Sequence, residues 1–181
     1  MDAACILGTL GSMEILVDTR EQQTKRAERR YGSFGCPYRR CTLSYGDYAC
    51  NAVLPGGQEI VDVSKTVKPL CAVERKMHID ELAQCFCSGR KRFTKEFERA
   101  KENGARIYLL IENGSWDDIV HGIYETRMNP KALLASVTAF MVRYNANLIF
   151  CREKTSGQLI REILYRDLKE RLEKGEFDTL I

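Results

Sequence analysis

Short apolar runs alternate with longer amphipathic segments through the second half of the chain. Residues 70–73, 105–112 and 148–151 are apolar runs of strand length, and the segment that begins at Pro130 repeats apolar residues at helical spacing. Strands separated by helices favour parallel pairing, because the helix carries the chain back across the sheet. A Pro-Gly-Gly turn at residues 55–57 predicts an additional antiparallel hairpin. The pattern therefore predicts an α/β fold with a central mixed β-sheet flanked by α-helices.

The expected elements follow from these periodicities. Strands are expected at residues 14–17, 36–45, 47–54, 59–63, 70–74, 105–112 and 148–151. Helices are expected at residues 21–30, 78–86, 90–101, 115–121, 130–144 and 158–173. Ser115 as an N-cap and Pro130 in a first turn support two of these helix starts. Residues 1–12 show no clear periodicity and are set apart as an N-terminal extension that can be disordered, which leaves residues 13–181 as a single domain.

Composition excludes some classes of protein. With 44% hydrophobic and 29% charged residues, a chain of 181 residues can bury one core and form one domain. No apolar run reaches the ~20 residues of a membrane span, and the N-terminus lacks the basic start of a secretory signal. The net charge of +3 is too small to identify a nucleic-acid partner, so the positions of the basic residues matter more than their number.

A carboxylate and an amine are predicted to lie side by side at residues 74–76. Side chains alternate along a strand, so Glu74 and Lys76 face one side of the sheet while Arg75 faces the other. Oxygen ligands suit Mg²⁺, and a metal-bound water beside an ammonium group is suited to phosphodiester hydrolysis. An isolated Glu-x-Lys is more often a solvated charge cluster, so its interpretation depends on the surrounding sequence.

Two acidic motifs precede this strand. Val-Asp-Thr-Arg-Glu at residues 17–21 ends an apolar run, and Gly-Asp-Tyr at residues 46–48 lies at an expected strand start. With Glu-Arg-Lys-x-x-x-Asp at residues 74–80, in this order, they resemble the XPF-type structure-specific endonuclease domain, a branch of the PD-D/ExK nuclease superfamily. Ser-Gly-Arg-Lys-Arg-Phe at residues 88–93 is similar to that family's Gly-Arg-containing turn. The resemblance covers residues 13–151 and implies a restriction-endonuclease-like nuclease fold.

The resemblance implies roles for the residues of the central motif. Asp47 and Glu74 would bind Mg²⁺ or Mn²⁺ together with the main-chain carbonyl of Arg75. Lys76 would position the attacking water. Arg75 would reach a phosphate or hold the motif in place through an acid such as Asp80.

Other acids are assigned supporting or alternative roles. Asp18 and Glu21 would serve as further catalytic acids near the metal. Asp80 would support the site, although the helix dipole alone also favours an acid in a first helical turn. Asp62, on the expected hairpin, is the alternative to Asp47 as the metal carboxylate.

Cations dominate the expected helix at residues 90–101. Phe93 and Phe97 recur at helical spacing as a buried stripe, and the cationic face is predicted to hold phosphates of DNA. The cations assigned to DNA contact are Arg90, Lys91, Arg92 and Lys95. A merely solvated helix is the alternative, because Glu96, Glu98 and Glu102 offer ion-pair partners to several cations.

Cysteine and histidine spacing does not favour a metal cluster. Eight cysteines in this chain are interpreted as reduced thiols, as in a cytosolic-type compartment. Some PD-D/ExK nucleases contain iron–sulfur clusters, but the close pair Cys85 and Cys87 has no matching second pair. His78 and His121 lack partners at zinc spacing and are interpreted as structural.

As a whole, the resemblance implies a divalent-metal-dependent DNA endonuclease that hydrolyses phosphodiester bonds in branched, flapped or junction DNA during repair or recombination. A non-catalytic DNA-binding or scaffold subunit and an RNA or single-strand nuclease are the alternatives. No helix-hairpin-helix repeats are expected after the nuclease domain, so selectivity for branched DNA would come from a homodimer, would come from another subunit, or would be absent. An apolar face on either of the last two expected helices is the candidate dimer surface. The expected location is the cytoplasm of a bacterium, an archaeon or a phage-infected host, or the nucleus of a eukaryote.

Overall fold

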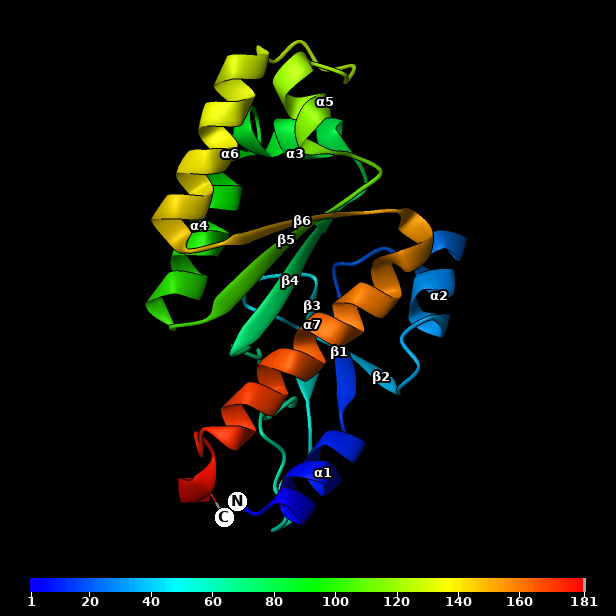
Figure 1. Cartoon of the computed structure of the whole chain (residues 1–181), viewed down its shortest axis with the longest axis vertical. Helices are drawn as coiled ribbons and strands as arrows, with labels where there is room; N and C mark the ends of the chain where they lie inside the picture. Colours follow the sequence, from blue (N-terminus) through cyan, green and yellow to red (C-terminus); the bar gives the residue numbers. More distant parts are fainter. Residues whose placement is uncertain (181) are drawn as a thin grey trace.

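The computed structural model describes residues 1–180 and confirms the predicted fold class. A mixed sheet of six strands forms the centre, with helices on both faces (Figure 1). The strands are β1 Glu14–Asp18, β2 Tyr38–Cys41, β3 Tyr48–Asn51, β4 Cys71–Lys76, β5 Arg106–Glu112 and β6 Asn147–Cys151. The helices are α1 Ala3–Gly11, α2 Lys25–Gly32, α3 Ile79–Phe86, α4 Arg90–Glu102, α5 Trp116–His121, α6 Pro130–Tyr144 and α7 Glu153–Glu173, followed by a 3₁₀ turn at Asp178–Leu180.

The strand order, β2-β1-β3-β4-β5-β6, determines where functional side chains can meet. β4, β5 and β6 are parallel to one another, and β1 is parallel to β2. β3 is antiparallel to both of its neighbours, β1 and β4. As a result, β3 starts at the same end of the sheet at which β1, β4 and β5 finish. This end of the sheet, across the strand termini, is called the sheet edge below. Residues near Asp47 therefore approach those near Glu74, although 27 positions separate them in the sequence.

Apolar side chains pack the two faces of the sheet into separate cores. One core joins α1, α2 and α7 to the sheet through residues such as Leu10, Tyr31 and Leu164. The other core joins α3, α4, α5 and α6, and its centre is a group of aromatic rings in which Phe93 stacks on Phe140 with centroids 5.2 Å apart. Helix α7 crosses the first face diagonally (Figure 1). The sheet edge at the end of β4 is thus bordered by α2 on one side and by α4 on the other.

The structure differs from the sequence-based expectation at the N-terminus. Residues 1–12 are not an irregular extension, because Ala3–Gly11 forms helix α1 with Asp2 as its N-cap. Leu10 of this helix is buried in the core, and the N-terminal amino group lies 2.9 Å from the Asp178 carboxylate. Helix α1 shows little sequence periodicity because Thr9 and Leu10 are its fully buried residues and Ile6 is only partly buried against the core.

Two other elements also differ from expectation. The second strand of the expected hairpin does not form, and a single antiparallel bridge between Val53 and Glu59 takes its place. Helix α7 begins at Glu153, before the expected residue 158, with Gly157 inside it. A Cβ atom at Gly157 would lie 2.5 Å from the carbonyl oxygen of Arg30, so the glycine allows α2 and α7 to pack closely. Within residues 1–180, no helix has the length and apolarity needed to cross a membrane.

Candidate functional site

The loop before β3 brings Asp47 against the end of β4. The main-chain N–H of Asp47 donates to the carbonyl of Val73 at 2.9 Å, and its carbonyl accepts from the N–H of Asp18 at the same distance. Gly46 makes this approach possible because its φ is +74° and an added Cβ would lie 2.7 Å from the Cβ of Ala72. The Gly-Asp pair therefore fixes a carboxylate at the sheet edge.

Glu74 and Lys76 lie side by side on the α4 face of β4, as strand alternation predicts. Their side chains are buried, and the Lys76 ammonium donates to Glu74 Oε1. Glu74 Oε2 is also buried but has no hydrogen-bond partner within residues 1–180. Asp47 contributes a second carboxylate, whose Oδ2 accepts from the N–H of Arg75 at 2.8 Å. The site thus holds a buried carboxylate oxygen that no donor in the described part of the chain satisfies.

Burial and like charge shift the ionisation of this cluster. Burial, followed by the negative charge of Glu74, raises the pKa of Asp47 to about 8. Burial also raises the pKa of Glu74, despite the neighbouring ammonium. For Lys76, burial opposes the charged form, but the Glu74 and Asp47 carboxylates outweigh it and raise the pKa above its ordinary value. Lys76 is therefore a cation at neutral pH.

These groups form the floor of an open cleft of about 440 Å³ between α2 and α4. Arg26 of α2 lines one side, and Arg92 and Glu96 of α4 line the other. In the alternative of a solvated helix, Glu96 is an ion-pair partner for cations of its own helix. Instead, its Oε1 accepts from the N–H of Gly46 at 2.9 Å, and burial together with the Asp47 charge raises its pKa. The sequence signal that could have identified it is its position between Phe93 and Phe97, at the border of the buried stripe.

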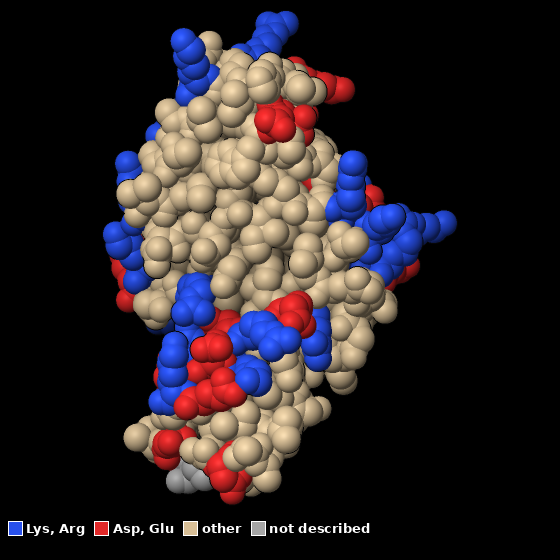
Figure 2. All heavy atoms as spheres, viewed as in Figure 1, with Lys and Arg blue, Asp and Glu red and all other residues tan. Residues whose placement is uncertain are grey.

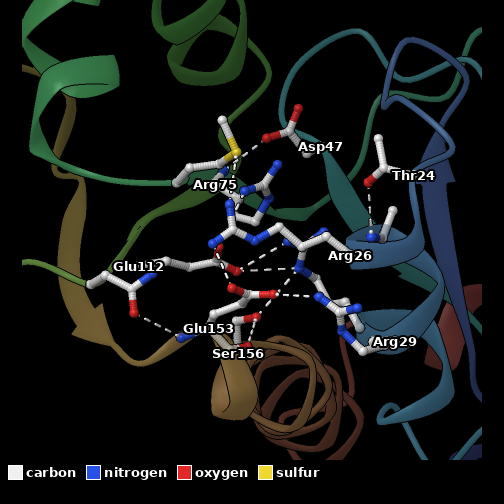
Figure 3. A network of polar contacts seen from close by, with 12 residues as sticks. Thr24, Arg26, Arg29, Asp47, Arg75, Glu112, Glu153 and Ser156 are labelled. Atoms are coloured by element: carbon white, nitrogen blue, oxygen red, sulfur yellow. Dashed lines mark hydrogen bonds and ion pairs between the residues drawn. The ribbon is translucent and has the colours of Figure 1, made fainter.

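Arg75 points to the opposite face of the sheet, into a buried ionic network (Figure 3). It donates to Glu21 Oε1 at 3.0 Å and to Glu112 Oε2 at 3.3 Å. Arg30 of α2 lies 3.2 Å from Glu112 Oε1, so Glu112 links both arginines. Sequence reasoning missed this role of Glu112, which is fully buried at the end of β5.

Asp80 is not the partner of Arg75, which corrects that part of the prediction. Asp80 Oδ1 accepts from the N–H groups of Glu125 and Thr126 at 2.8 and 2.7 Å, and so it anchors the segment between α5 and α6. His78 caps α3 by accepting from the N–H of Glu81. These contacts give Asp80 and His78 structural roles next to the motif.

Asp18 and Glu21 occupy different positions relative to the cleft. Asp18 is fully buried, and its oxygens accept from the Arg20 guanidinium and from the N–H of Leu43 at 2.9 Å. It does not line the cleft. Glu21 does line it, but its Oε1 accepts from Tyr48 as well as Arg75. Their proposed participation as catalytic acids stays a prediction.

The cations assigned to DNA contact lie on the exposed face of α4. Arg90, Lys91, Arg92 and Lys95 are all exposed, and none forms an ion pair with another residue of the described chain. Arg92 also lines the cleft. By contrast, Arg99 and Lys101 donate to the carbonyls of Ser44 and Arg143. The first turns of α4 thus present free cations next to the carboxylates.

The donor set of the cleft fits a hard divalent cation. No three Asp, Glu, His or Cys side chains of residues 1–180 are placed to hold a metal ion, so a ligand set here must include main-chain or water oxygens. The N–H and C=O of one strand residue point to the same neighbouring strand, and the N–H of Arg75 points to Asp47. The Arg75 carbonyl therefore faces the same side as the Asp47 carboxylate. Asp62 belongs to an exposed turn, where it contacts Ser64 and Lys65, and does not line the cleft.

Comparison with known proteins identifies the family. A family model described as the ERCC4 domain matches residues 17–163, most of the chain. The chain belongs to the ERCC4 domain family. This confirms the expected XPF-type nuclease domain. No curated protein sequence matches this ERCC4 domain significantly.

Solved structures share the fold of this ERCC4 domain. It is similar to XPF from Aeropyrum pernix, with a TM-score of 0.58 and 21% identity over 85% of this chain and 61% of that chain. The similarity to XPF from Aeropyrum pernix in complex with DNA has a TM-score of 0.59 and 21% identity, over 88% of this chain and 66% of that chain. The ERCC4 domain described here thus spans less than two thirds of the length of either structure.

Proposed function

We propose that this ERCC4 domain is a divalent-metal-dependent endonuclease that hydrolyses phosphodiester bonds of DNA. The observation that carries the proposal is that Asp47 and Glu74 line one cleft beside the charged Lys76, and that Glu74 Oε2 is buried with no hydrogen-bond partner among residues 1–180. Family membership and the likeness to a DNA-bound XPF structure support DNA as the substrate. The proposal assigns the open cleft to the scissile phosphate.

Asp47, Glu74 and the Arg75 carbonyl would hold Mg²⁺ or Mn²⁺. Such a cation, when bound, lowers the pKa of a coordinated water and neutralises charge that develops on phosphate oxygens. The Glu74 oxygen without a hydrogen-bond partner among residues 1–180 is free to bind a cation. Burial, followed by the Glu74 charge, raises the pKa of Asp47, and a bound cation would offset both effects by stabilising the carboxylates in their charged form.

Lys76 would orient the attacking water and donate to a non-bridging phosphate oxygen. Its charge and its buried contact with Glu74 favour this role over that of general base, because an ammonium has no lone pair to accept a proton. Arg75 would act from the other face as a positioning residue. Its contacts with Glu21 and Glu112 fix the end of β4, on which both Glu74 and Lys76 depend.

Branched, flapped or junction DNA is the proposed substrate, in repair or recombination. The free cations of α4 would contact phosphates on one side of the cleavage position. In a homodimer, the second copy of the chain would add a second set of contacts to such a substrate. Val120, Ile123 and Val142, which are 47%, 64% and 85% exposed, favour the α5–α6 side as its interface. Figure 2 shows a broad region without charged side chains over β6 and the neighbouring helices.

A cleavage assay tests the proposal. Branched, flapped, linear duplex and single-stranded DNA, together with RNA, would be incubated with Mg²⁺, Mn²⁺ or EDTA. We expect metal-dependent cuts in DNA, with branched substrates cut fastest. Binding to DNA without cleavage of any substrate would contradict the enzyme assignment and favour a scaffold subunit.

A sedimentation experiment that compares the Val142→Asp/Ile123→Asp variant with wild type tests the homodimer, since loss of an apolar interface should leave a monomer.

A further inference from the structure

A second group of cations borders the cleft on the side opposite α4. Arg26 and Arg29 of α2, with Arg152 and Lys154 at the start of α7, line a hollow of about 600 Å³. Figure 2 shows Lys and Arg side chains gathered at the right edge of the molecule, where Figure 1 places α2 and the first turn of α7. These four residues are called the α2/α7 basic patch below.

Little negative charge in the hollow balances the patch. Among the described residues that line it, Glu153 is the one acid. Glu153 forms ion pairs with both Arg26 and Arg29, and its contact with Arg29 is 3.3 Å long (Figure 3). Arg152 and Lys154 are exposed and make no ion pair with any residue of the described chain. Four cations thus face one carboxylate.

Two further features make the hollow suited to an anion. Helix α7, which is 21 residues long, begins here. The side chain of its N-cap residue, Arg152, forms no capping hydrogen bond, while the N–H of Glu153 donates to Asn113 Oδ1 at 3.3 Å. The positive end of the helix dipole therefore adds to the field of the cations. Arg30, which is 4% exposed, also lines the hollow; its Nη2 has no hydrogen-bond partner within residues 1–180, although Glu112 balances its charge from 3.2 Å.

The patch is continuous with the candidate active site. Arg26 and Arg30 line both the hollow and the cleft that contains Asp47 and Glu74. Arg92 of α4 lines the same cleft from the opposite side. A polyanion that lies across the sheet edge would therefore meet cations before and after the carboxylates.

We propose that the α2/α7 basic patch is a second phosphate-contact surface, which holds the DNA backbone on the side of the cleft opposite the α4 cations. The inference rests on the proposed nuclease function and extends it from one set of phosphate contacts to two. DNA crosses the edge of the sheet with its scissile phosphate above Glu74. The two cationic surfaces bind phosphates on either side of the cut.

Charge reversal of the two unpaired cations tests the patch. Binding of Arg152→Glu/Lys154→Glu to a duplex DNA would be measured by fluorescence anisotropy in EDTA, between 50 and 200 mM salt, so that no cleavage is needed. Loss of two phosphate contacts should reduce affinity by about tenfold or more at the lower salt concentration and make the salt slope shallower by about 1–2. Acids in a first helical turn are favoured by the dipole, so the melting temperature should not fall.

The matched control reverses two cations of the same helix outside the patch. Arg166 and Lys169 pair with Glu162 and Glu173, so Arg166→Glu/Lys169→Glu makes the same change in net charge where acids already neutralise the surface. Its salt slope should equal that of wild type. Glu153→Gln should have the opposite effect on DNA affinity. Removal of this negative charge leaves Arg26 and Arg29 without their ion-pair partner, so DNA binding should become tighter.

The outcomes separate this inference from the function on which it rests. If wild type binds DNA and the Arg152→Glu/Lys154→Glu variant has the same affinity and salt slope as wild type, the proposed role of the patch in DNA binding is overturned and the nuclease proposal stands. If the control variant loses as much affinity as the patch variant, the change in net charge alone explains the loss, and the proposed role of the patch is again overturned. Failure of wild type to bind DNA would overturn both proposals.

Discussion

The main-chain N–H of Arg75 donates a hydrogen bond to Asp47 Oδ2 at 2.8 Å. This contact joins the two acidic motifs, because it fixes the carboxylate that precedes β3 against the strand that carries Glu74 and Lys76. The side chain of Arg75 meanwhile extends to the other face of the sheet, where it contacts Glu21 and Glu112. One residue thus couples the geometry of the candidate site to a buried ionic network beneath it.

Removal of either candidate metal ligand should abolish cleavage. Asp47→Ala and Glu74→Ala are each expected to lower the cleavage rate by about 10³-fold or more, since a catalytic metal supplies several kcal/mol of transition-state stabilisation. DNA affinity in EDTA should remain near that of wild type, because neither residue belongs to the exposed cationic surfaces. Single-turnover cleavage together with anisotropy would check both results. A Glu74→Ala variant that still cleaves DNA would contradict the assignment of Glu74 as a metal ligand.

Lys76 should affect turnover more than binding. Lys76→Ala is expected to lower the single-turnover rate by about 10²–10³-fold, the usual effect of losing one positioned donor in an active site. DNA affinity should change less than threefold, because the buried ammonium contacts Glu74 rather than solvent. Equal losses in rate constant and affinity would instead indicate that Lys76 is a simple phosphate contact.

The free cations of α4 should contribute to DNA binding with a distinct salt dependence. Charge reversal of Arg90, Lys91 and Arg92 is expected to weaken binding and to make the salt slope shallower by about 0.9 for each lost phosphate contact. Reversal of Arg99 is a suitable comparison, because this residue already donates to the carbonyl of Ser44 at 3.0 Å. An unchanged slope for the triple variant would exclude the α4 surface as a DNA contact.

Asp47 should make the metal-free protein less stable as pH rises. Its pKa is about 8 in the folded protein, against an ordinary value of 3.8, so between these values the folded state holds a proton that the unfolded state has released. The free energy of unfolding therefore falls with pH across that range. Asp47→Asn keeps an acceptor for the Arg75 N–H but cannot ionise, and it should be more stable than wild type by about 0.5–2 kcal/mol near pH 8–9.

Denaturant unfolding in EDTA at several pH values between 4 and 9 would measure this difference. The two proteins should have similar stability near pH 4, where Asp47 is protonated in wild type. Stability curves that remain parallel over the whole range would show that Asp47 does not ionise abnormally.

Glu112 should be important for folding and, through Arg75, for catalysis. Removal of one partner from a buried charge network typically costs 3–5 kcal/mol, so Glu112→Ala should be strongly destabilised. Glu112→Gln retains an acceptor oxygen and should lose less. If the network positions β4, Glu112→Gln should lower the single-turnover rate while leaving DNA affinity near that of wild type. If Glu112→Ala unfolds at the same denaturant concentration as wild type and cleaves DNA at the same single-turnover rate, Glu112 has neither of these roles.

Local sequence patterns were sufficient for the strands that carry the site. Apolar runs predicted strands at residues 14–17 and 70–74, and the structure extends these to β1, which ends at Asp18, and β4, which ends at Lys76. A cap or a proline predicted the starts of α5 and α6. Strand alternation predicted that Glu74 and Lys76 share a face while Arg75 takes the other. These features depend on neighbours in the sequence, so one sequence can show them.

Tertiary packing decided the features that were not predicted. Glu96 faces the cleft because Gly46 approaches α4, and Glu112 is buried because α2 brings Arg30 to the end of β5. Helix α1 contacts the core through Leu10 and, less completely, through Ile6, which are too few positions to give a clear amphipathic pattern in the sequence. Arg75 could be assigned to a face from the sequence, but its choice of Glu21 and Glu112 over Asp80 depends on how the sheet and helices assemble.

Anomalous diffraction from a crystal soaked in Mn²⁺ tests the central claim most directly. The account predicts one strong manganese peak in the cleft, within about 2.5 Å of oxygens from both Asp47 and Glu74, and loss of that peak in Glu74→Gln. A peak located elsewhere, or one that persists unchanged in Glu74→Gln, would contradict the assignment of this carboxylate pair as the metal site.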